Sequence, residues 1–251
     1  MAKTEETAGL SQTLNNDFIS STNGGKSLVI RQKTLSEESF QRISALESLD
    51  TLILIQDKFN EKHLAYLSSL IHLKTLVLTG SSFSDVGIRV LPDLPELTSL
   101  SLPGTNITDV GLTELCRFTK LGSINVSQTH ITTLNGLICL HNLEKLDIAN
   151  CRALNTLEPL VTLPKLESLN ISRTRSALTN EVGRLRYLKE LSISELNLSE
   201  LRKLKAHLRQ VNFSGCFPTK RSLNQFKKSL PNTRPSFGYI EASNWNYSGE
   251  N

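Results

Sequence analysis

A short leucine phrase that repeats along most of the chain constrains the fold more than any other feature. Its most regular copies begin at Leu121, Leu143 and Leu166, at steps of 22 and 23 residues. Each has aliphatic residues at the first, fourth and sixth positions and Thr or Cys at the ninth. A fixed period in this range is typical of a solenoid, whose units pack only on their neighbours. Such a scaffold offers a surface and does not by itself indicate a reaction.

Further copies extend the array to about nine units, of which the first, around Leu28, is degenerate. They begin at Leu49, Leu73, Leu97, Leu188 and Leu208. Aliphatic residues two apart lie on one side of a strand, so stacked copies would build a parallel sheet over a leucine core. We therefore predict an α/β solenoid, a right-handed superhelix with a concave parallel β-sheet and helical or 3₁₀ returns on the convex side.

The segments between the phrases differ along the chain. Two of the 24-residue units continue as Ser84-Asp85-Val-Gly and Thr108-Asp109-Val-Gly, which predicts helices that begin near the aspartates. The later, shorter returns, such as that around Leu134, suit a 3₁₀ turn. Small polar side chains dominate the ninth position and predict a ladder of hydrogen bonds, in which Leu196 cannot take part. That column reads Lys33, Asp57, Ser81, Thr105, Thr129, Cys151, Thr174, Leu196 and Cys216.

Composition sets the expected boundaries of the array. Residues 1–27 are polar and contain Asn23-Gly24-Gly25, which predicts a flexible N-terminal tail. The repeat domain, with its terminal caps, is expected over 28–230 and should end in an amphipathic helix within 219–230. Pro231 breaks that helix, so 231–251 is expected to be a C-terminal tail.

Residues 28–230 resemble the leucine-rich repeat superfamily. The 24-residue units are similar to its cysteine-containing and related classes, and the units from Leu121 to Leu188 to the class found in phosphatase-regulating and ribonucleoprotein members. The ninth position departs from both, because it holds mostly Thr or Ser where those classes favour Asn or Cys. The resemblance implies protein binding on the concave sheet or on the edges that flank it.

Charge is unevenly distributed along the chain. The net charge is +4, yet the segment from Arg184 to Arg234 holds twelve Lys and Arg against three Glu. Such asymmetry indicates an acidic partner, RNA included, or alternatively a solvated cap. Eight of these residues are candidate contacts with RNA or an acidic partner: Arg202, Lys203, Lys205, Arg209, Lys220, Arg221, Lys227 and Lys228.

Targeting and redox signals favour an intracellular protein. The N-terminus has no apolar signal segment, and no apolar run approaches the roughly 18 residues that a membrane span needs. The four cysteines contain no C-x-x-C pair, and repeat geometry accounts for Cys151 and Cys216. We expect a cytoplasmic location, with the nucleus or a ribonucleoprotein assembly as the alternative, and no contact with membranes.

The sequence gives little support for catalysis. Its five histidines share no ordered spacing with a Cys or Ser nucleophile, and no glycine loop follows a strand in a phosphate-binding pattern. We predict that the protein is not an enzyme and has no cofactor, metal site or small-molecule substrate.

The repeat register assigns the residues that point outward from the strands. These predicted protein-binding positions are Val29, Ile53, Ile55, Val77, Thr79, Ser101, Asn125, Asp147, Asn170 and Arg173. The four aliphatic residues among them would form an unusual apolar patch unless the N-terminal tail or a loop covers it. The Ser and Asn positions have a simpler interpretation, which is that they keep an exposed sheet soluble.

Three functions fit these observations. The first is a non-enzymatic scaffold that binds a partner protein through the concave sheet and its N-terminal apolar patch. The second is a structural component of a ribonucleoprotein complex whose basic C-terminal cap faces RNA. The third, a regulatory or adaptor subunit of a phosphatase or ubiquitin ligase, rests on family analogy alone.

Overall fold

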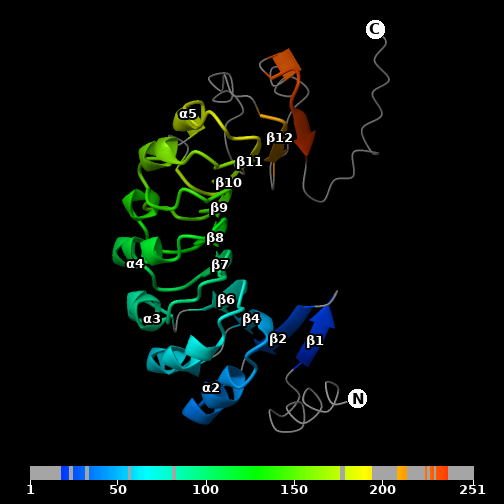
Figure 1. Ribbon diagram of the computed structural model, residues 1–251. Helices are drawn as coiled ribbons and strands as arrows, with labels where there is room; N and C mark the ends of the chain where they lie inside the picture. Colours follow the sequence, from blue (N-terminus) through cyan, green and yellow to red (C-terminus); the bar gives the residue numbers. More distant parts are fainter. Residues whose placement is uncertain are drawn as a thin grey trace.

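The protein forms an arc with strands on the concave side and helical segments on the convex side (Figure 1). The computed structural model describes residues 18–22, 25–31, 34–55, 58–80, 83–175, 179–193, 208–213, 224, 227–228 and 230–236. None of the helices within these ranges is long and apolar enough to cross a bilayer. The predicted solenoid with a concave sheet is confirmed.

One sheet of eleven strands runs the length of the arc. Its strands, in both spatial and chain order, are β1 (Phe18–Thr22), β2 (Gly25–Arg31), β4 (Leu49–Ile55), β6 (Thr75–Thr79), β7 (Ser99–Ser101), β8 (Ser123–Asn125), β9 (Lys145–Asp147), β10 (Ser168–Asn170), β11 (Glu190–Ile193), β12 (Gln210–Phe213) and β13 (Arg234–Ser236). All neighbours pair in parallel except β1, which is antiparallel to β2. A second, two-stranded sheet joins β3 (Thr34–Leu35) to β5 (Lys58–Phe59) in parallel.

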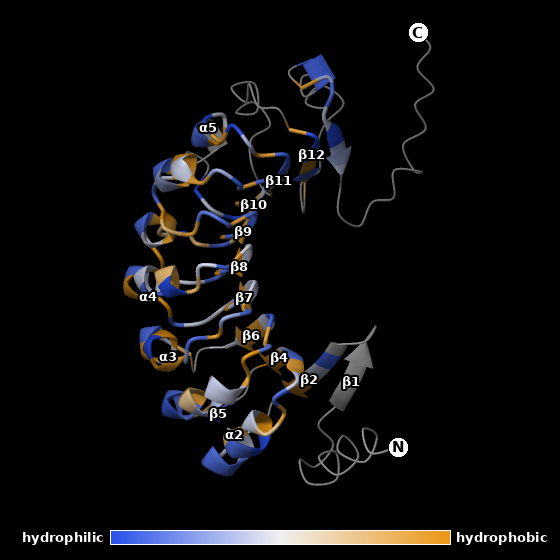
Figure 2. Cartoon of the chain, in the orientation of Figure 1, coloured by the Kyte–Doolittle hydropathy of each residue, from blue (hydrophilic) through white to orange (hydrophobic). Residues whose placement is uncertain are grey.

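The core is a stack of aliphatic layers between the sheet and the returns. In β6, Leu76 and Leu78 are buried while the residues beside them are half-buried, as the alternation in the phrase predicts. The buried residues form one continuous cluster from Leu28 to Leu230. Figure 2 shows this apolar character on both the strands and the returns.

The returns are helical or 3₁₀, as the spacing predicts. Helix α2 (Glu37–Ser44) begins with a capping box between Ser36 and Ser39. The side chains of Ser84 and Thr108 cap α3 (Asp85–Val90) and α4 (Asp109–Glu114), so both aspartates occupy the first helical position. The other returns are η1 (Glu61–Ser69), η2 (Leu115–Arg117), η3 (Asn135–Leu137), η4 (Glu158–Thr162) and α5 (Thr179–Val182).

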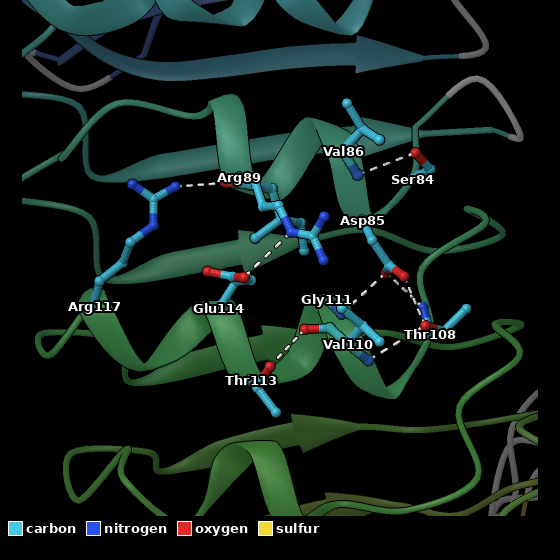
Figure 3. A network of polar contacts seen from close by, with 11 residues as sticks. Ser84, Asp85, Val86, Arg89, Thr108, Val110, Gly111, Thr113, Glu114 and Arg117 are labelled. Atoms are coloured by element: carbon cyan, nitrogen blue, oxygen red, sulfur yellow. Dashed lines mark hydrogen bonds and ion pairs between the residues drawn. The ribbon is translucent and has the colours of Figure 1, made fainter.

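Carboxylates on the convex side connect successive repeats. The Asp85 carboxylate accepts hydrogen bonds from the backbone N–H of Thr108 at 2.8 Å and from the Thr108 hydroxyl at 2.6 Å (Figure 3). Glu61 makes the same contacts with Ser84 one repeat earlier, and Asp109 makes them with Thr132 one repeat later. Each carboxylate therefore satisfies donors at the start of the next return, which helix geometry leaves unpaired.

A strand lies within each of the two predicted tails. Residues 18–22 form β1, although the sequence predicted a flexible tail over 1–27, and β13 pairs with β12 beyond the predicted boundary at residue 230. The physical reason is that the end strands of a sheet otherwise leave a row of backbone groups without partners. Of the capping helix expected within 219–230, the structure describes only residues 224, 227–228 and 230.

A disulfide that the sequence did not indicate joins two neighbouring returns. Cys116 in η2 and Cys139 after η3 are bonded, with their Cα atoms 5.6 Å apart. The repeat register does not align the two cysteines, because Cys116 lies five residues before Leu121 whereas Cys139 lies four before Leu143. Cys151 is free and buried, as its place in the ninth-position column predicts.

Candidate protein-binding surfaces

The outward positions form one registered row along the concave sheet. Each member of this row is the pairing partner of the next across adjacent strands. In order, the row reads Val29, Ile53, Val77, Ser101, Asn125, Asp147, Asn170, Ser192 and Asn212. The predicted register is therefore correct over nine strands.

Aliphatic residues gather at the N-terminal end of this row. Val29 lies opposite Ile53, which lies opposite Val77, while Ile55 occupies the next outward position of β4 beside Thr79. All five side chains are half-buried. We call Val29, Ile53, Ile55 and Val77 the apolar patch.

Strand β1 does not lie across the apolar patch. It pairs edge to edge with β2, Phe18 opposite Val29, and so lengthens the sheet in the same layer. Residues 1–17, which the sequence offered as an alternative cover, lie outside the described residues. Within the part of the chain that the structure describes, no second layer covers the patch (Figure 1).

The polar residues in the middle of the row terminate strands. The side-chain oxygens of Asn125, Asp147 and Asn170 each accept the backbone N–H two residues ahead, at 2.9, 2.9 and 3.0 Å. Asn170 also donates its amide to the Asp147 carboxylate at 3.0 Å. These are Asx-type turns, so the three side chains have a local structural role that the sequence analysis did not recognise.

Arg173 lies beyond the end of β10 and not on the strand itself. It follows β10 in a turn where φ is +59°, the left-handed value also found at Gln128 and Asn150. Gly80 and Gly104 hold the equivalent position in earlier repeats, with φ of +104° and +66°. The residue at this position therefore reverses the chain at the sheet rim, and its exposed side chain belongs to that rim.

The structure describes three of the eight predicted basic contacts. Arg209, Lys227 and Lys228 are exposed. The other five, Arg202, Lys203, Lys205, Lys220 and Arg221, lie outside the described residues.

Arg209 belongs to a groove that sequence reasoning missed. This edge groove, of about 550 Å³, lies at the starts of β9–β12 and holds the basic side chains Lys165, Arg186, Lys189 and Arg209. Glu144, Glu167 and Tyr187 contribute the acidic and aromatic side chains. Six of these seven residues are adjacent to the first leucine of a phrase, and Arg186 lies two residues before one. The repeat register could therefore have revealed the groove.

Metal ligands are not clustered in the described ranges, where no group of three or more His, Cys, Asp or Glu could hold a metal ion.

No protein-family model matches the chain, and no curated protein matches it. Among solved structures, it is similar to internalin C2 from Listeria monocytogenes, with 25% sequence identity and a TM-score of 0.55 over 74% of this chain and 80% of that chain. The chain has a leucine-rich repeat fold.

Two further leucine-rich repeat structures show the same likeness at lower similarity. The internalin InlF from Listeria monocytogenes is 16% identical, with a TM-score of 0.46 over 94% of both chains. The plant peptide hormone receptor RGFR1, solved with RGF2, is 16% identical, with a TM-score of 0.48 over 89% of this chain and 37% of that chain.

Threonine performs the ninth-position role in this leucine-rich repeat. The hydroxyls of Thr105, Thr129 and Thr174 donate to the carbonyl oxygen three residues earlier, at 2.8, 2.6 and 2.6 Å. The Cys151 thiol reaches back to the carbonyl of Val126 in the preceding repeat, 3.2 Å away. The predicted ladder is confirmed at these four positions, and a hydroxyl can replace the side chains that the family favours because it supplies the same donor.

Proposed function

We propose that this protein is a non-enzymatic scaffold that binds a partner protein on its concave sheet, with the apolar patch as the anchor. The observation that carries the proposal is the unbroken register of Val29, Ile53 and Val77 on an uncovered stretch of sheet. Contiguous aliphatic residues on an exposed face mark interaction sites, because water solvates them poorly.

The rigid frame supports this role. The outward side chains stand on strands that pair on both sides, so binding would order few side chains and no backbone. The row changes from aliphatic at Val77 to polar at Ser101, and from there polar residues line it as far as Asn212. A partner would therefore make apolar contacts with β2, β4 and β6, and polar contacts with the strands from β7 to β12.

A comparison of two charge substitutions in the same row tests the proposal. Ile53→Asp places a carboxylate in the apolar patch, whereas Ser192→Asp places one near the other end of the row, on a strand paired on both sides. Both variants should first be shown to unfold at temperatures close to that of the wild type. In affinity purification from the native source, a bound partner should be lost with Ile53→Asp and retained with Ser192→Asp.

Retention of every partner by Ile53→Asp would count against the apolar patch as the anchor. The ribonucleoprotein and regulatory-subunit alternatives stay predictions, since nothing in the described ranges favours either one.

A further inference from the structure

The edge groove lies on a different surface from the apolar patch and toward the opposite end of the arc. Its residues flank the starts of β9–β12, whereas the patch lies on the outward face of β2, β4 and β6 (Figure 1). Backbone pairing fixes its spacing, because Lys189 N–H donates to Glu167 O at 2.7 Å and Arg209 N–H donates to Lys189 O at 2.7 Å. The side chains of the groove are therefore attached to backbone that hydrogen bonds hold in place.

The groove has unpaired positive charge. Its four basic residues exceed its two acidic residues, and the Lys189 ammonium is already paired with the Glu167 carboxylate. Lys165 donates to the Asn142 side-chain oxygen at 2.7 Å. Arg186 and Arg209 are exposed, and in the part of the chain that the structure describes their guanidinium groups have no partner. Two planar donors are therefore available for carboxylates.

An aromatic side chain lines the same groove as these two arginines. Tyr187 precedes the first leucine of its phrase and is 58% exposed, more than any other large apolar residue described. An exposed ring beside guanidinium groups is the composition that recognition sites favour, because it provides apolar area at a small cost in side-chain entropy.

We propose that the edge groove binds an acidic, extended segment of a protein partner. Carboxylates of that segment pair with Arg186 and Arg209, and one of its aromatic or aliphatic side chains packs on Tyr187. The groove fits a peptide better than RNA, because its lining offers one aromatic ring where single-stranded RNA sites use several.

Fluorescence anisotropy with defined probes tests this inference on the full chain. The probe is a fluorescein-labelled decapeptide of Glu and Asp with one central Phe, compared with a Lys-substituted version and with a ten-nucleotide oligouridine. The acidic peptide should bind and the Lys peptide should not. Arg186→Glu with Arg209→Glu should weaken binding of the acidic peptide at least tenfold, since each substitution removes a charge-assisted hydrogen bond and places a negative charge beside the carboxylates of the peptide.

Matched variants separate the groove from other effects. Tyr187→Ala should weaken binding of the acidic peptide that contains Phe. It should not change binding of a matched peptide in which Gly replaces that Phe. Arg175→Glu reverses another exposed charge, beyond the other end of β10, and should bind the acidic peptide like the wild type. Ile53→Asp should also bind the acidic peptide like the wild type. A failure of the edge-groove inference can therefore be distinguished from a failure of the concave-face proposal. Equal binding by the Arg186 and Arg209 variants, or tighter binding of oligouridine than of the acidic peptide, would overturn the inference.

Discussion

Oδ1 of Asp85 accepts a hydrogen bond from the backbone N–H of Gly111 at 3.0 Å, although the two residues belong to successive repeats. A Cβ atom on Gly111 would collide with that same oxygen. Gly87 has the same relationship with Glu61, whose carboxylate its Cβ would meet at 2.7 Å. The glycine two residues after the aspartate thus makes room for the carboxylate of the preceding repeat (Figure 3).

Substitution of Gly111 should therefore destabilise the fold. Alanine usually stabilises a helix by up to about 1 kcal/mol relative to glycine, but here it must displace a half-buried carboxylate that accepts hydrogen bonds from Thr108 and Gly111. We expect Gly111→Ala to lower the free energy of unfolding by about 1 to 2 kcal/mol, measured by urea denaturation. Gly122→Ala is the control, since its nearest neighbours would be an ordinary 3.6 Å away. If Gly111→Ala leaves the free energy of unfolding unchanged, the Asp85 carboxylate can move away without loss of stability.

The carboxylate contacts also predict how stability depends on pH. Burial raises the pKa of Asp109, but hydrogen bonds from Thr132 and Thr133 outweigh burial and hold that pKa below its usual value. A lowered folded-state pKa means that the stabilisation is complete above the unfolded pKa of about 3.9 and is lost as pH falls through the lower, folded value. Asp109→Asn should therefore cost stability at pH 7, and the difference from wild type should shrink below pH 4.

Denaturation from pH 7 to pH 2 measures this difference. Asp93→Asn serves as the control, because the Asp93 carboxylate is 91% exposed and its ion pair with Arg117 is a surface pair of small expected effect. A difference between wild type and Asp109→Asn that stays constant over the whole range would contradict the assignment.

The left-handed turn at the sheet rim allows a stabilising substitution. Gln128 has φ of +59°, a conformation that costs a non-glycine residue roughly 1 to 2 kcal/mol, partly offset by the greater entropy that glycine loses on folding. Gln128→Gly should raise the free energy of unfolding by about 0.5 to 1 kcal/mol. Gln128→Ala should have no such effect because it keeps the strain and removes only the exposed side chain. Equal effects from the two substitutions would assign the change to the side chain.

The disulfide predicts both a stability change and a redox dependence. Cys116 and Cys139 are 23 positions apart in the sequence, and loss of a cross-link that closes a loop of that size costs about 3 kcal/mol in the chain-entropy model. Cys116→Ser with Cys139→Ser should lower stability by about this amount, and a reducing agent should reproduce the loss in the wild type only. A wild type that is insensitive to reductant would argue against the bond.

The same bond bears on the expected cellular location. Disulfides persist in oxidising compartments and are rare in the cytosol, whereas the sequence predicted a cytoplasmic protein. Thiol labelling of protein taken directly from its native source distinguishes the two: an oxidised pair is expected outside the cytosol and two free thiols within it. Until that is measured, the intracellular location stays a prediction.

The parts of the fold that recur were predictable, and the parts that depend on a single contact were not. Leucine spacing gives the register of the outward row from Val29 to Asn212, because strand alternation leaves one register. It did not indicate that β1 would pair with β2, since one antiparallel strand has no repeat to reveal it. Nor did it indicate the left-handed turn at Arg173, because the repeat phrase carries no information on the sign of φ.

The candidate surfaces divide in the same way. The apolar patch follows from the outward positions alone, and the structure places its residues side by side. The edge groove is lined by residues beside the first leucine of the phrase, such as Tyr187, whose positions the repeat register gives although their side chains vary between repeats. Only the stacking of β9–β12 brings these residues to one place.

Site-specific photo-crosslinking tests the proposed concave-face function most directly. A benzophenone amino acid replaces Ile53 in the apolar patch or, as the control, Ile138, which is 48% exposed on the convex side. We predict that irradiation in the native source yields a crosslinked protein partner from position 53 and not from position 138. Crosslinks from position 138 alone, or equal crosslinking from both, would contradict the proposal that the concave sheet holds the partner.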